Sequence, residues 1–324
     1  MRNALLVYNP ESGRRRQARL RDVESVRAAL TAGGVNAQPL ATTGPATAAR
    51  QVTDALAQGF DTLIVCAGDG TINEVLPAIV NTPAALGVVP LGTANVLAND
   101  LGIPRNPAVA AKILLSAAPR STPLVRMDYA DLTGQPRWRY FIAAAGIGAD
   151  AQLVYALTAA FKQRWGMAAY YAEASRQWAT HSFPLFAVEF TSPDGRLRRE
   201  TVSQVLAVRI TWFGGMLKRL APGAALHRPG LQLVLFKTRR RLHYLRYMLG
   251  VWLERPWALP EVELVPATSC RCLPLDQTPP LAIDHRTSTI DRIYAEADGE
   301  LLGTLPVSIT MTSDSVNLLV PNKN

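Results

Sequence analysis

The sequence contains few cysteines and no long apolar segment. Three cysteines are an odd number, and the Cys270/Cys272 pair is spaced more tightly than the usual metal or redox motifs, so we expect reduced thiols in a cytoplasmic protein. No stretch approaches the roughly 18 consecutive apolar residues that a membrane-spanning helix needs. The apolar run 4–8 is too short for a secretion signal, and the arginine cluster 14–16 follows it. Any contact with a membrane is therefore expected to be peripheral.

The generic nucleotide-binding motifs are missing too. No G-x-x-x-x-G-K-[ST] loop is present, and the segment that begins at Gly68 has Asn73 where a G-x-G-x-x-G fingerprint requires its third glycine. The four histidines are scattered, without the paired spacing of a metal site, so we assign none of them as a ligand. No recognised nucleic-acid-binding module accompanies the positive charge of the chain, which argues against a nucleic-acid partner.

What is present fits two domains. The 324 residues, 48% of them hydrophobic, are enough for two cores of ordinary size. The chain has 34 lysines and arginines against 25 acidic residues, and this net charge of +9 favours an anionic partner such as a phosphate ligand or an acidic membrane surface. The pattern of the sequence changes near Arg126. We therefore place one domain at residues 1–126, with residues 304–324 returning to complete it, and a second at residues 127–303.

The first domain alternates short apolar runs with helical patterns. Apolar runs at 4–8, 62–66 and 86–89 predict strands, and the segments 17–32 and 47–58 predict helices between them. Strands that are separated by helices indicate parallel βαβ units. We therefore expect an α/β domain with a doubly wound, mostly parallel sheet that binds a nucleotide.

The second domain has shorter apolar runs separated by turn sequences such as Ser-Pro-Asp-Gly at 192–195. This pattern is typical of antiparallel strands joined by hairpins. Two helical segments, 151–178 and 241–254, interrupt it. We expect a largely antiparallel β-sandwich, with strands at 183–190, 197–202, 205–210, 231–236 and 290–297.

The strongest local motif is Cys-Ala-Gly-Asp-Gly-Thr-Ile-Asn-Glu-Val at 66–75, placed where a strand should pass into a helix. Glycines on both sides of Asp69 would allow positive φ and a close approach of the backbone to a ligand, so that amide groups can point at phosphate oxygens. Thr71 and Glu74 have the spacing of a capping box at the helix start. Pro77 should kink or shorten that helix. The alternative interpretation of Gly-Asp-Gly-Thr is an ordinary tight turn.

Two further loops have the same character. Pro-Leu-Gly-Thr-Ala-Asn at 90–95 follows another apolar strand, and Asn-Pro-Glu-Ser-Gly at 9–13 follows the first strand. The carboxyl ends of parallel strands meet at the same edge of a sheet, where α/β proteins bind their ligands. The three loops are therefore expected to converge there.

In this order the motifs resemble those of the diacylglycerol kinase catalytic fold, which bacterial diacylglycerol kinase-type lipid kinases share with sphingosine and ceramide kinases. The resemblance implies an ATP-dependent kinase that phosphorylates the hydroxyl of a membrane lipid, such as diacylglycerol or a sphingoid-type lipid, with the help of Mg²⁺. It rests on five segments that span nearly the whole chain: Asn9-Pro10-x-Ser12-Gly13, Gly68-Asp69-Gly70-Thr71-x-Asn73-Glu74, Leu91-Gly92-Thr93-x-Asn95, Ala145-Gly146-x-Gly148-x-Asp150 and Asp298-Gly299-Glu300.

The resemblance also implies roles for individual residues. Asp298 would be the general base that accepts the proton of the lipid hydroxyl, although some relatives are thought to use the loop aspartate, here Asp69, and Asp298-Gly299 could also be a simple hairpin turn. Asp69 would hold Mg²⁺ directly or through water. The family usually has a glycine where this chain has Ala67. Nucleotide binding would involve Asn9, Thr42, Ala67, Gly68, Asp69, Gly70, Thr71, Ile72, Asn73, Glu74, Gly92, Thr93 and Asn95.

One segment departs from the family pattern. Bacterial relatives commonly carry an acidic residue of a structural metal site just before a glycine, but this chain has Arg228 and Pro229 before Gly230. Neither residue offers a carboxylate oxygen. We expect that metal site to be absent or rebuilt.

Several alternatives remain open from the sequence. A related enzyme that phosphorylates a soluble nucleotide, as NAD kinases do, shares the Gly-Asp-Gly-Thr loop, and a non-catalytic nucleotide-binding regulator could retain it. The arginine runs 14–16 and 239–241 fit either a solvated surface or contact with anionic lipid headgroups. Segment 151–178, Trp252 and Trp257 fit either packing or contact with acyl chains. We expect a lipid substrate at an anionic membrane surface as the partner, and a homodimer is compatible with the sequence.

Overall fold

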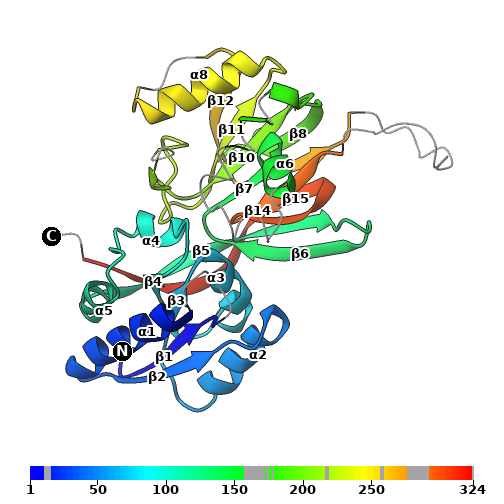
Figure 1. Cartoon of the computed structure of the whole chain (residues 1–324). Coiled ribbons are helices and arrows are strands. Elements are labelled where there is room, and N and C mark those ends of the chain that lie inside the picture. Colours follow the sequence, from blue (N-terminus) through cyan, green and yellow to red (C-terminus); the bar gives the residue numbers. More distant parts are fainter. Residues whose placement is uncertain are drawn as a thin grey trace. The chain divides into compact units, whose positions relative to one another are not determined.

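The chain forms two compact units. The computed structural model describes residues 1–10, 16–156, 172, 175–176, 179–215, 219–255, 259–275 and 292–322 (Figure 1). The first unit comprises Met1–Leu124, Trp212–Gly215 and Thr312–Asn324, and the second comprises Val125–Thr211 and Met216–Met311. Predictions for Ser12, Gly13, Trp257, most of segment 157–178 and residues 290–291 lie outside the described residues.

The first unit is built on a parallel sheet. β1 (Asn3–Tyr8) pairs in parallel with β2 (Asn36–Ala41) and with β3 (Thr62–Ala67), and β3 pairs in parallel with β4 (Ala85–Pro90). Every residue of β3 and β4 is buried, as expected for central strands of a sheet that is covered on both faces. The end of β15 (Glu300–Val320) returns to this sheet and pairs in parallel with β4.

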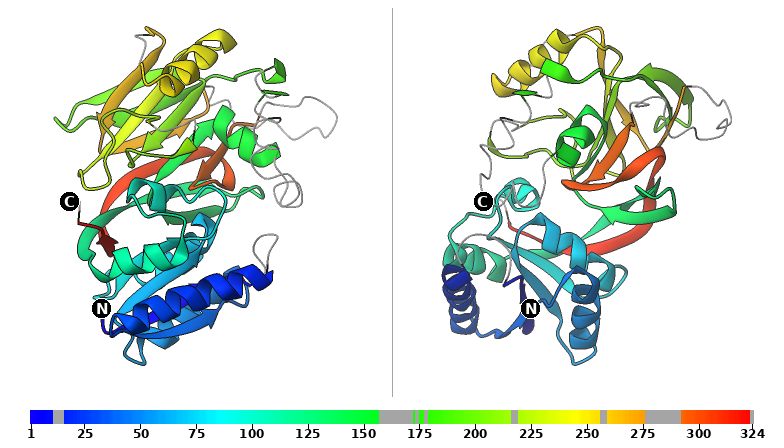
Figure 2. Two further views of the ribbon diagram at one scale, coloured as in Figure 1. Left: turned by 60° about the vertical axis from the view of Figure 1, so that its left-hand side comes forward. Right: turned by 45° about the vertical axis from the view of Figure 1, so that its right-hand side comes forward.

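Helices cover both faces of this sheet, so the predicted doubly wound α/β fold is confirmed. α1 (Arg16–Ala32) packs on α5 (Pro107–Leu115), and α2 (Pro45–Leu56) packs on α3 (Asp69–Val75). Figure 2 shows α1 and α5 on one face of the sheet and α2 on the other. α4 (Val96–Asp100) is a short helix after β4.

The helix after β3 differs from the prediction at its start. α3 begins at Asp69, and Gly68 is its N-cap residue without a side-chain hydrogen bond, so the predicted Thr71/Glu74 capping box is wrong. Thr71 lies inside the first turn because the chain becomes helical directly after β3. Pro77 acts as predicted, since α3 ends at Val75 and a short 3₁₀ helix (Leu76–Ala78) replaces its continuation.

The second unit is antiparallel throughout its described strand pairs. β7 (Ala144–Gly148) lies between β10 (Gln204–Val208) and β14 (Tyr294–Ala297), and β10 continues the sheet through β11 (Leu231–Phe236) to β12 (Val262–Ala267). The predicted antiparallel β-sandwich is confirmed. The remaining strands are β5 (Ala118–Ala130), β6 (Pro136–Phe141), β8 (Phe186–Thr191), β9 (Leu197–Val202), β13 (Ser269–Leu273) and β15.

The core of this unit consists of the inward side chains of these strands, and the rings of Phe141, Phe186 and Phe190 are among the most buried. α6 (Ala149–Ala156) covers the described start of the predicted helix 151–178. α8 (Arg241–Trp252) ends two residues earlier than predicted. Within the described parts of the chain, no helix is both long and apolar enough to cross a bilayer.

The return of β15 to the first unit has a testable energetic consequence. Leu318 pairs with Leu86 of β4 and is fully buried. Leu318→Ala should lower the free energy of unfolding by about 2–5 kcal/mol, because it removes buried methyl groups and leaves a cavity. Urea unfolding measures the change, and Leu20→Ala on the exposed face of α1 is the control. Equal unfolding midpoints for the two variants would contradict a packed role for the end of β15.

Candidate functional site

Two loops of the first unit and the described start of a third, at Asn9, lie at the carboxyl edge of its sheet, as the sequence predicts. The N–H of Leu91, after β4, donates to the carbonyl of Ala67, at the end of β3, at 3.1 Å. Arg19 of α1 connects the loop after β4 with the loop after β1. Its Nη2 donates to the Leu91 carbonyl at 3.2 Å, and its Nη1 donates to the Asn9 carbonyl after β1 at 3.5 Å.

The two glycine loops touch backbone to backbone at Gly68 and Gly92. A Cβ atom on Gly92 would lie 2.4 Å from the Cα of Gly68, and a Cβ on Gly68 would lie 3.2 Å from the Cα of Gly92. Gly68 has a φ of −96°, and Gly70 is not among the residues with positive φ. The expectation that these glycines adopt positive φ is therefore wrong. Close approach of one loop to the other is the reason that Gly68 and Gly92 have no side chain.

Asp69 ties the same two loops together with its carboxylate. Oδ2 accepts from the N–H of Val96 at 3.1 Å, and Oδ1 accepts from the N–H of Leu97 at 3.4 Å. Both donors are the first residues of α4, so one acidic side chain fixes the helix that follows the second loop. Burial raises the pKa of Asp69, and these amide donors oppose that rise.

Asn95 closes the second loop on itself. Its Oδ1 accepts from the N–H of Gly92 and its Nδ2 donates to the Gly92 carbonyl, both at 2.8 Å. The side chain is buried and the backbone has a left-handed φ of 51°. Thr93 is exposed, and its carbonyl accepts from Nη2 of Arg105 at 3.3 Å. Asn95 therefore shapes this loop, while Thr93 and Ala94 face solvent.

The side chains after Gly70 point inward. Thr71, Ile72 and Asn73 are all at most 8% exposed, so this part of the motif can meet a ligand chiefly through its main chain. Thr42, directly after β2, is also buried, and its hydroxyl has no hydrogen-bond partner in the described part of the chain. A buried hydroxyl without a partner is costly, and a bound ligand would satisfy it.

Arg19 is a site residue that the sequence analysis missed. It is partly buried on α1, and burial lowers the pKa of its guanidinium. It lies among the arginines at 14–21, which read as a surface run, and only its helical position brings it between the loops. Its positive charge beside two of the three loops favours an anionic ligand at this edge.

In the second unit, Asp298 and Gly299 form the two-residue loop of the hairpin between β14 and β15. Their φ values are 49° and 78°, and Ala297 pairs with Glu300 across the loop. Two residues with positive φ are typical of a type I′ turn. The hairpin alternative for Asp298-Gly299 is thus confirmed, while a role of Asp298 as a base remains a prediction.

The carboxylate of Asp298 is held by the main chain. Oδ2 accepts from the N–H of Ile142 at 2.9 Å, and Oδ1 accepts from those of Ala143 and Ala144 at 2.9 and 3.1 Å. Three amide donors stabilise the negative charge and occupy three of roughly four acceptor positions of the carboxylate. Fully buried Arg209 adds positive charge toward Asp298, and burial lowers its pKa to about 10.

A pair of acidic side chains, Asp150 and Glu296, lies against Gly146. Part of the Asp150 residue reaches the surface, but its carboxyl group is enclosed and hydrogen bonded to that of Glu296. A Cβ on Gly146 would lie 2.5 Å from Asp150 Oδ2 and 2.9 Å from Glu296 Oε1. Glu296 Oε2 also accepts from the N–H of Gly299 at 2.8 Å, which connects the pair to the hairpin loop.

The two carboxyl groups cannot both be charged at low cost. Burial raises the pKa of Asp150 to about 6, and burial together with the negative charge of Asp150 raises the pKa of Glu296 well above its usual range. Asp150 is part of the motif at 145–150, whereas no motif predicted a role for Glu296. The available signal was a lone acidic residue within the short apolar strand 294–297.

The residues present fit Mg²⁺ only if a bound nucleotide supplies part of its ligands. Among the described residues, no group of three or more His, Cys, Asp or Glu side chains is arranged to hold a metal ion. Mg²⁺ in kinases takes most of its ligands from phosphate oxygens and water, with one or two carboxylates, and Asp69 can be one of these. At the other segment considered for a metal, the guanidinium of Arg228 donates to the Gly223 carbonyl at 3.2 Å.

The acidic pair predicts a pH dependence of stability. Because the pKa of Asp150 is raised in the folded chain, the folded chain binds more protons than the unfolded chain from about pH 4 upward. The free energy of unfolding should therefore fall as pH rises from about pH 4, and the raised pKa of Glu296 extends this fall to higher pH. Urea unfolding at several pH values should show this fall in the wild type and a flatter curve for Asp150→Asn. Asp54→Asn on exposed α2 is the control, and an unchanged slope in Asp150→Asn would contradict the prediction.

Comparisons with known proteins identify the family of both units. Residues 3–127 match the family model described as diacylglycerol kinase catalytic domain. Residues 143–320 match the model described as YegS C-terminal NAD kinase beta sandwich-like domain. A crystal structure of a diacylglycerol kinase from Bacillus anthracis str. Sterne has a TM-score of 0.68 at 17% identity, covering 99% of this chain and 97% of that one. Another crystal structure from the same strain reaches a TM-score of 0.74 at 19% identity and covers 99% and 95%. These structures show a shared fold.

Relatives found by sequence have a higher identity to this chain than those two structures. The diacylglycerol kinase of Bacillus subtilis (strain 168) is 30% identical over 250 residues, which cover 76% of this chain and 77% of the relative. A diacylglycerol kinase of Staphylococcus saprophyticus is 30% identical over 172 residues, about half of each chain at 52% and 53%. With matching models for both units and this coverage, the chain belongs to the diacylglycerol kinase family.

Proposed function

We propose that the protein is an ATP-dependent lipid kinase, which transfers the γ-phosphoryl group of ATP to the hydroxyl of a membrane lipid such as diacylglycerol or a sphingoid-type lipid. Membership of a kinase family implies ATP as the phosphate donor. The observation that carries the proposal is the backbone contact of Gly68 with Gly92, which brings two glycine loops together at the ligand-binding edge of a parallel sheet. The related protein of Bacillus subtilis is named a diacylglycerol kinase.

The loops of the first unit supply what a triphosphate needs. Phosphoryl transfer depends mainly on positioning and on neutralising the charge of the transferring oxygens. We propose that the main-chain amides of segment 68–73 and of segment 92–95 bind the phosphates, with Asn9 and the buried hydroxyl of Thr42 at the same edge. Arg19 adds a fixed positive charge beside these loops.

Two carboxylates are assigned different roles. Asp69 would hold Mg²⁺, which when bound neutralises phosphate charge. Asp298 would accept the proton of the lipid hydroxyl, and the three amides that donate to it hold its carboxylate in place. Glu296 holds the hairpin loop that carries Asp298, because its Oε2 accepts from the N–H of Gly299.

We further propose that the enzyme is cytoplasmic and meets its substrate at an anionic membrane surface as a peripheral protein. The excess of basic over acidic residues, 34 against 25, supports attraction to such a surface. An NAD kinase-like activity on a soluble nucleotide is the second candidate. The observation that favours it is the match of residues 143–320 to a domain model described as NAD kinase beta sandwich-like.

A substrate panel separates the candidates. Purified protein is incubated with radiolabelled ATP, Mg²⁺ and either diacylglycerol, a sphingoid base, ceramide or a prenol in detergent micelles, or NAD in solution. We expect a labelled lipid product on thin-layer chromatography and no labelled dinucleotide. Labelling of NAD alone would replace the proposed function with the second candidate, and binding of ATP without any product would indicate a regulator.

Asp69→Asn should weaken binding of Mg-nucleotide and slow turnover, because it removes the negative charge while the side chain keeps its size. Isothermal titration calorimetry with a non-hydrolysable ATP analogue and Mg²⁺ measures the affinity. Asp61→Asn is the matched control, since Asp61 also accepts main-chain N–H groups, from Arg2 and Asn3, but at the amino edge of the same sheet. If both variants bind Mg-nucleotide like the wild type, Asp69 does not hold the metal.

Asp298→Asn should lower turnover by roughly 10²–10⁴-fold while nucleotide affinity is retained, because the basic oxygen is lost. The rate of the wild type should fall with decreasing pH as the base becomes protonated, and the residual rate of the variant should lack this dependence. Asp131→Asn is the matched control. Asp131 lies in the hairpin between β5 and β6 and accepts from the N–H groups of Thr133 and Gln135 at 2.9 and 3.0 Å.

An unfolding curve of Asp298→Asn accompanies this test, because the new amide group would face one of three N–H donors. Near-normal turnover in a folded Asp298→Asn variant would move the base to Asp69, whose raised pKa suits proton acceptance.

A further inference from the structure

Helix α8 of the second unit carries an apolar stripe on its solvent side. Six large apolar side chains of this helix and of the residue after it are between 36% and 59% exposed: Leu242, Leu245, Met248, Leu249, Trp252 and Leu253. Their spacing of three and four residues places them along one side of the helix. Large exposed apolar patches on otherwise folded proteins mark interaction sites.

The opposite side of α8 already forms the packing that fixes the helix. His243, Tyr244, Tyr247, Gly250 and Val251 are buried. The ring of Tyr244 stacks on that of Phe236 with 4.4 Å between the centroids, and the ring of Tyr247 meets Phe236 edge-on at 5.2 Å. The exposed stripe is therefore a second apolar face on a helix that is already docked. A helix that is apolar on both faces normally has both covered.

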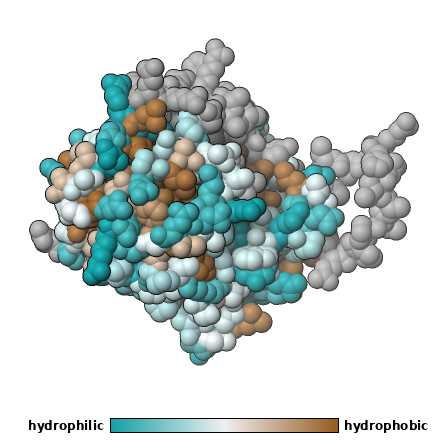
Figure 3. All heavy atoms as spheres, turned by 90° about the horizontal axis from the view of Figure 1, so that it is seen from below, coloured by the Kyte–Doolittle hydropathy of each residue, from teal (hydrophilic) through white to brown (hydrophobic). Residues whose placement is uncertain are grey.

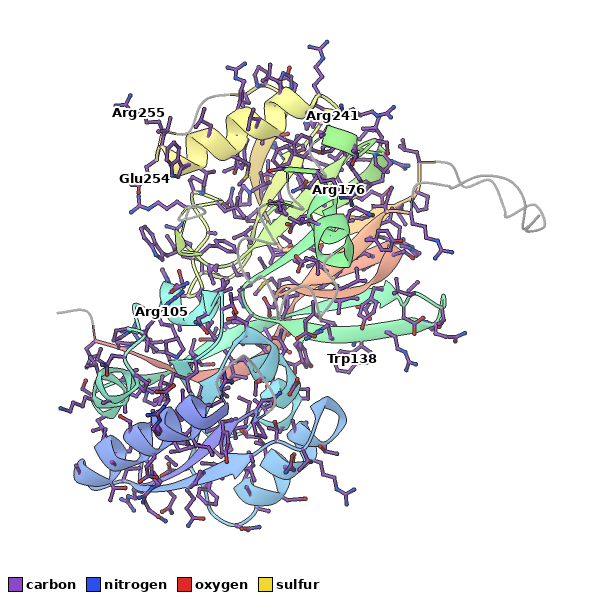
Figure 4. The ribbon with its side chains drawn as sticks, in the orientation of Figure 1. Arg105, Trp138, Arg176, Arg241, Glu254 and Arg255 are labelled. Atoms are coloured by element: carbon purple, nitrogen blue, oxygen red, sulfur yellow. The ribbon has the colours of Figure 1, made fainter. Side chains whose placement is uncertain are left out.

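Basic residues border this stripe. Segment 239–255 contains five arginines, at 239, 240, 241, 246 and 255, and one acidic residue, Glu254. Figure 4 shows Arg241 at one end of α8 and Glu254 with Arg255 at the other. The guanidiniums of Arg239 and Arg241 donate to the carbonyls of Ser182 and His181, which are uncharged acceptors. With five arginines and one acidic residue, the segment has a net positive charge beside its apolar side chains.

The exposed Trp138 on β6 differs from the side chains of this stripe, because its ring already has neighbours. Trp138 on β6 is covered in part by the guanidinium of Arg126, which lies 4.7 Å from its ring centroid, and its ring meets that of Tyr140 edge-on at 5.2 Å. On the face that Figure 3 shows, hydrophobic residues lie among hydrophilic ones. An apolar stripe with an arginine border is a feature of α8.

The length of the helix limits what it can do with a membrane. The 12 residues of α8, at about 1.5 Å of rise per residue, extend roughly 18 Å, well short of the hydrocarbon thickness of about 30 Å. A short helix with leucines and a tryptophan on one side and arginines beside them suits the headgroup boundary, where it lies parallel to the surface. The arginines match the negative charge of anionic lipids.

We propose that the exposed face of α8 docks the enzyme on an anionic lipid bilayer, with Leu242, Leu245, Leu249 and Trp252 inserted at the headgroup boundary and the arginines on the headgroups. The inference deepens the proposed function and rests on it, because a kinase whose acceptor is a bilayer lipid has to reach that bilayer. It assigns the contact to one helix, which neither the motifs nor the relatives identify.

The test is co-sedimentation of the full chain with vesicles of phosphatidylcholine alone or mixed with phosphatidylglycerol. We expect the wild type to bind the mixed vesicles more tightly, and added salt to weaken that binding. Leu245→Gln/Leu249→Gln should reduce affinity about tenfold or more, because two apolar side chains no longer insert. Arg240→Gln/Arg246→Gln should remove the preference for phosphatidylglycerol. The control is Leu132→Gln/Leu197→Gln, which changes two exposed leucines of the same unit outside α8 and should bind like the wild type.

Turnover on lipid in detergent micelles separates this inference from the proposed function. Leu245→Gln/Leu249→Gln should keep the micellar rate, since neither residue belongs to the candidate site. If the wild type phosphorylates micellar lipid but binds no vesicles, the docking inference is wrong and the proposed kinase activity stands. If it binds vesicles but forms no lipid product, the proposed kinase activity is wrong and the docking inference stands. Light scattering gives a further outcome. If the wild type is a dimer that binds no vesicles, and Leu245→Gln/Leu249→Gln is a monomer, the docking inference is wrong and α8 forms a contact between two chains.

Discussion

The candidate nucleotide site depends on one close contact, between the backbones of Gly68 and Gly92. Any side chain at Gly92 would meet the Cα of Gly68 at 2.4 Å. This contact brings together the loops after β3 and β4, and the Asp69 carboxylate then joins them through the first amides of α4. The result is a run of main-chain groups at the edge of a parallel sheet, held without large side chains that would block phosphates.

The same chemistry, a carboxylate that accepts main-chain N–H groups, recurs in the second unit with a different outcome. Asp298 receives three such bonds in a hairpin loop, whereas the adjacent Glu296 shares a proton-binding site with Asp150. Burial favours the neutral form of Glu296. One hairpin therefore carries a carboxylate held by main-chain donors next to a carboxyl group that resists charge.

The proposed transfer of a phosphoryl group to a lipid places two demands on the chain. The loops of the first unit have to be rigid, because phosphoryl transfer depends on position. A lipid acceptor requires in addition a surface that can bind a bilayer. The apolar stripe of α8 with its arginines would be that surface. The two features lie in different units, so they can be altered separately by mutation.

The sequence by itself determined the fold class and the three loops, because hydrophobic period and glycine-rich turns are local properties. It also determined the end of α3 at Pro77. Tertiary structure decided why Gly68 lacks a side chain, which acid pairs with Glu296, and that Arg19 reaches two loops. These features depend on which strands become neighbours and on which face of a helix is buried. Contacts between residues far apart in the chain leave no local pattern, so only the folded chain reveals them.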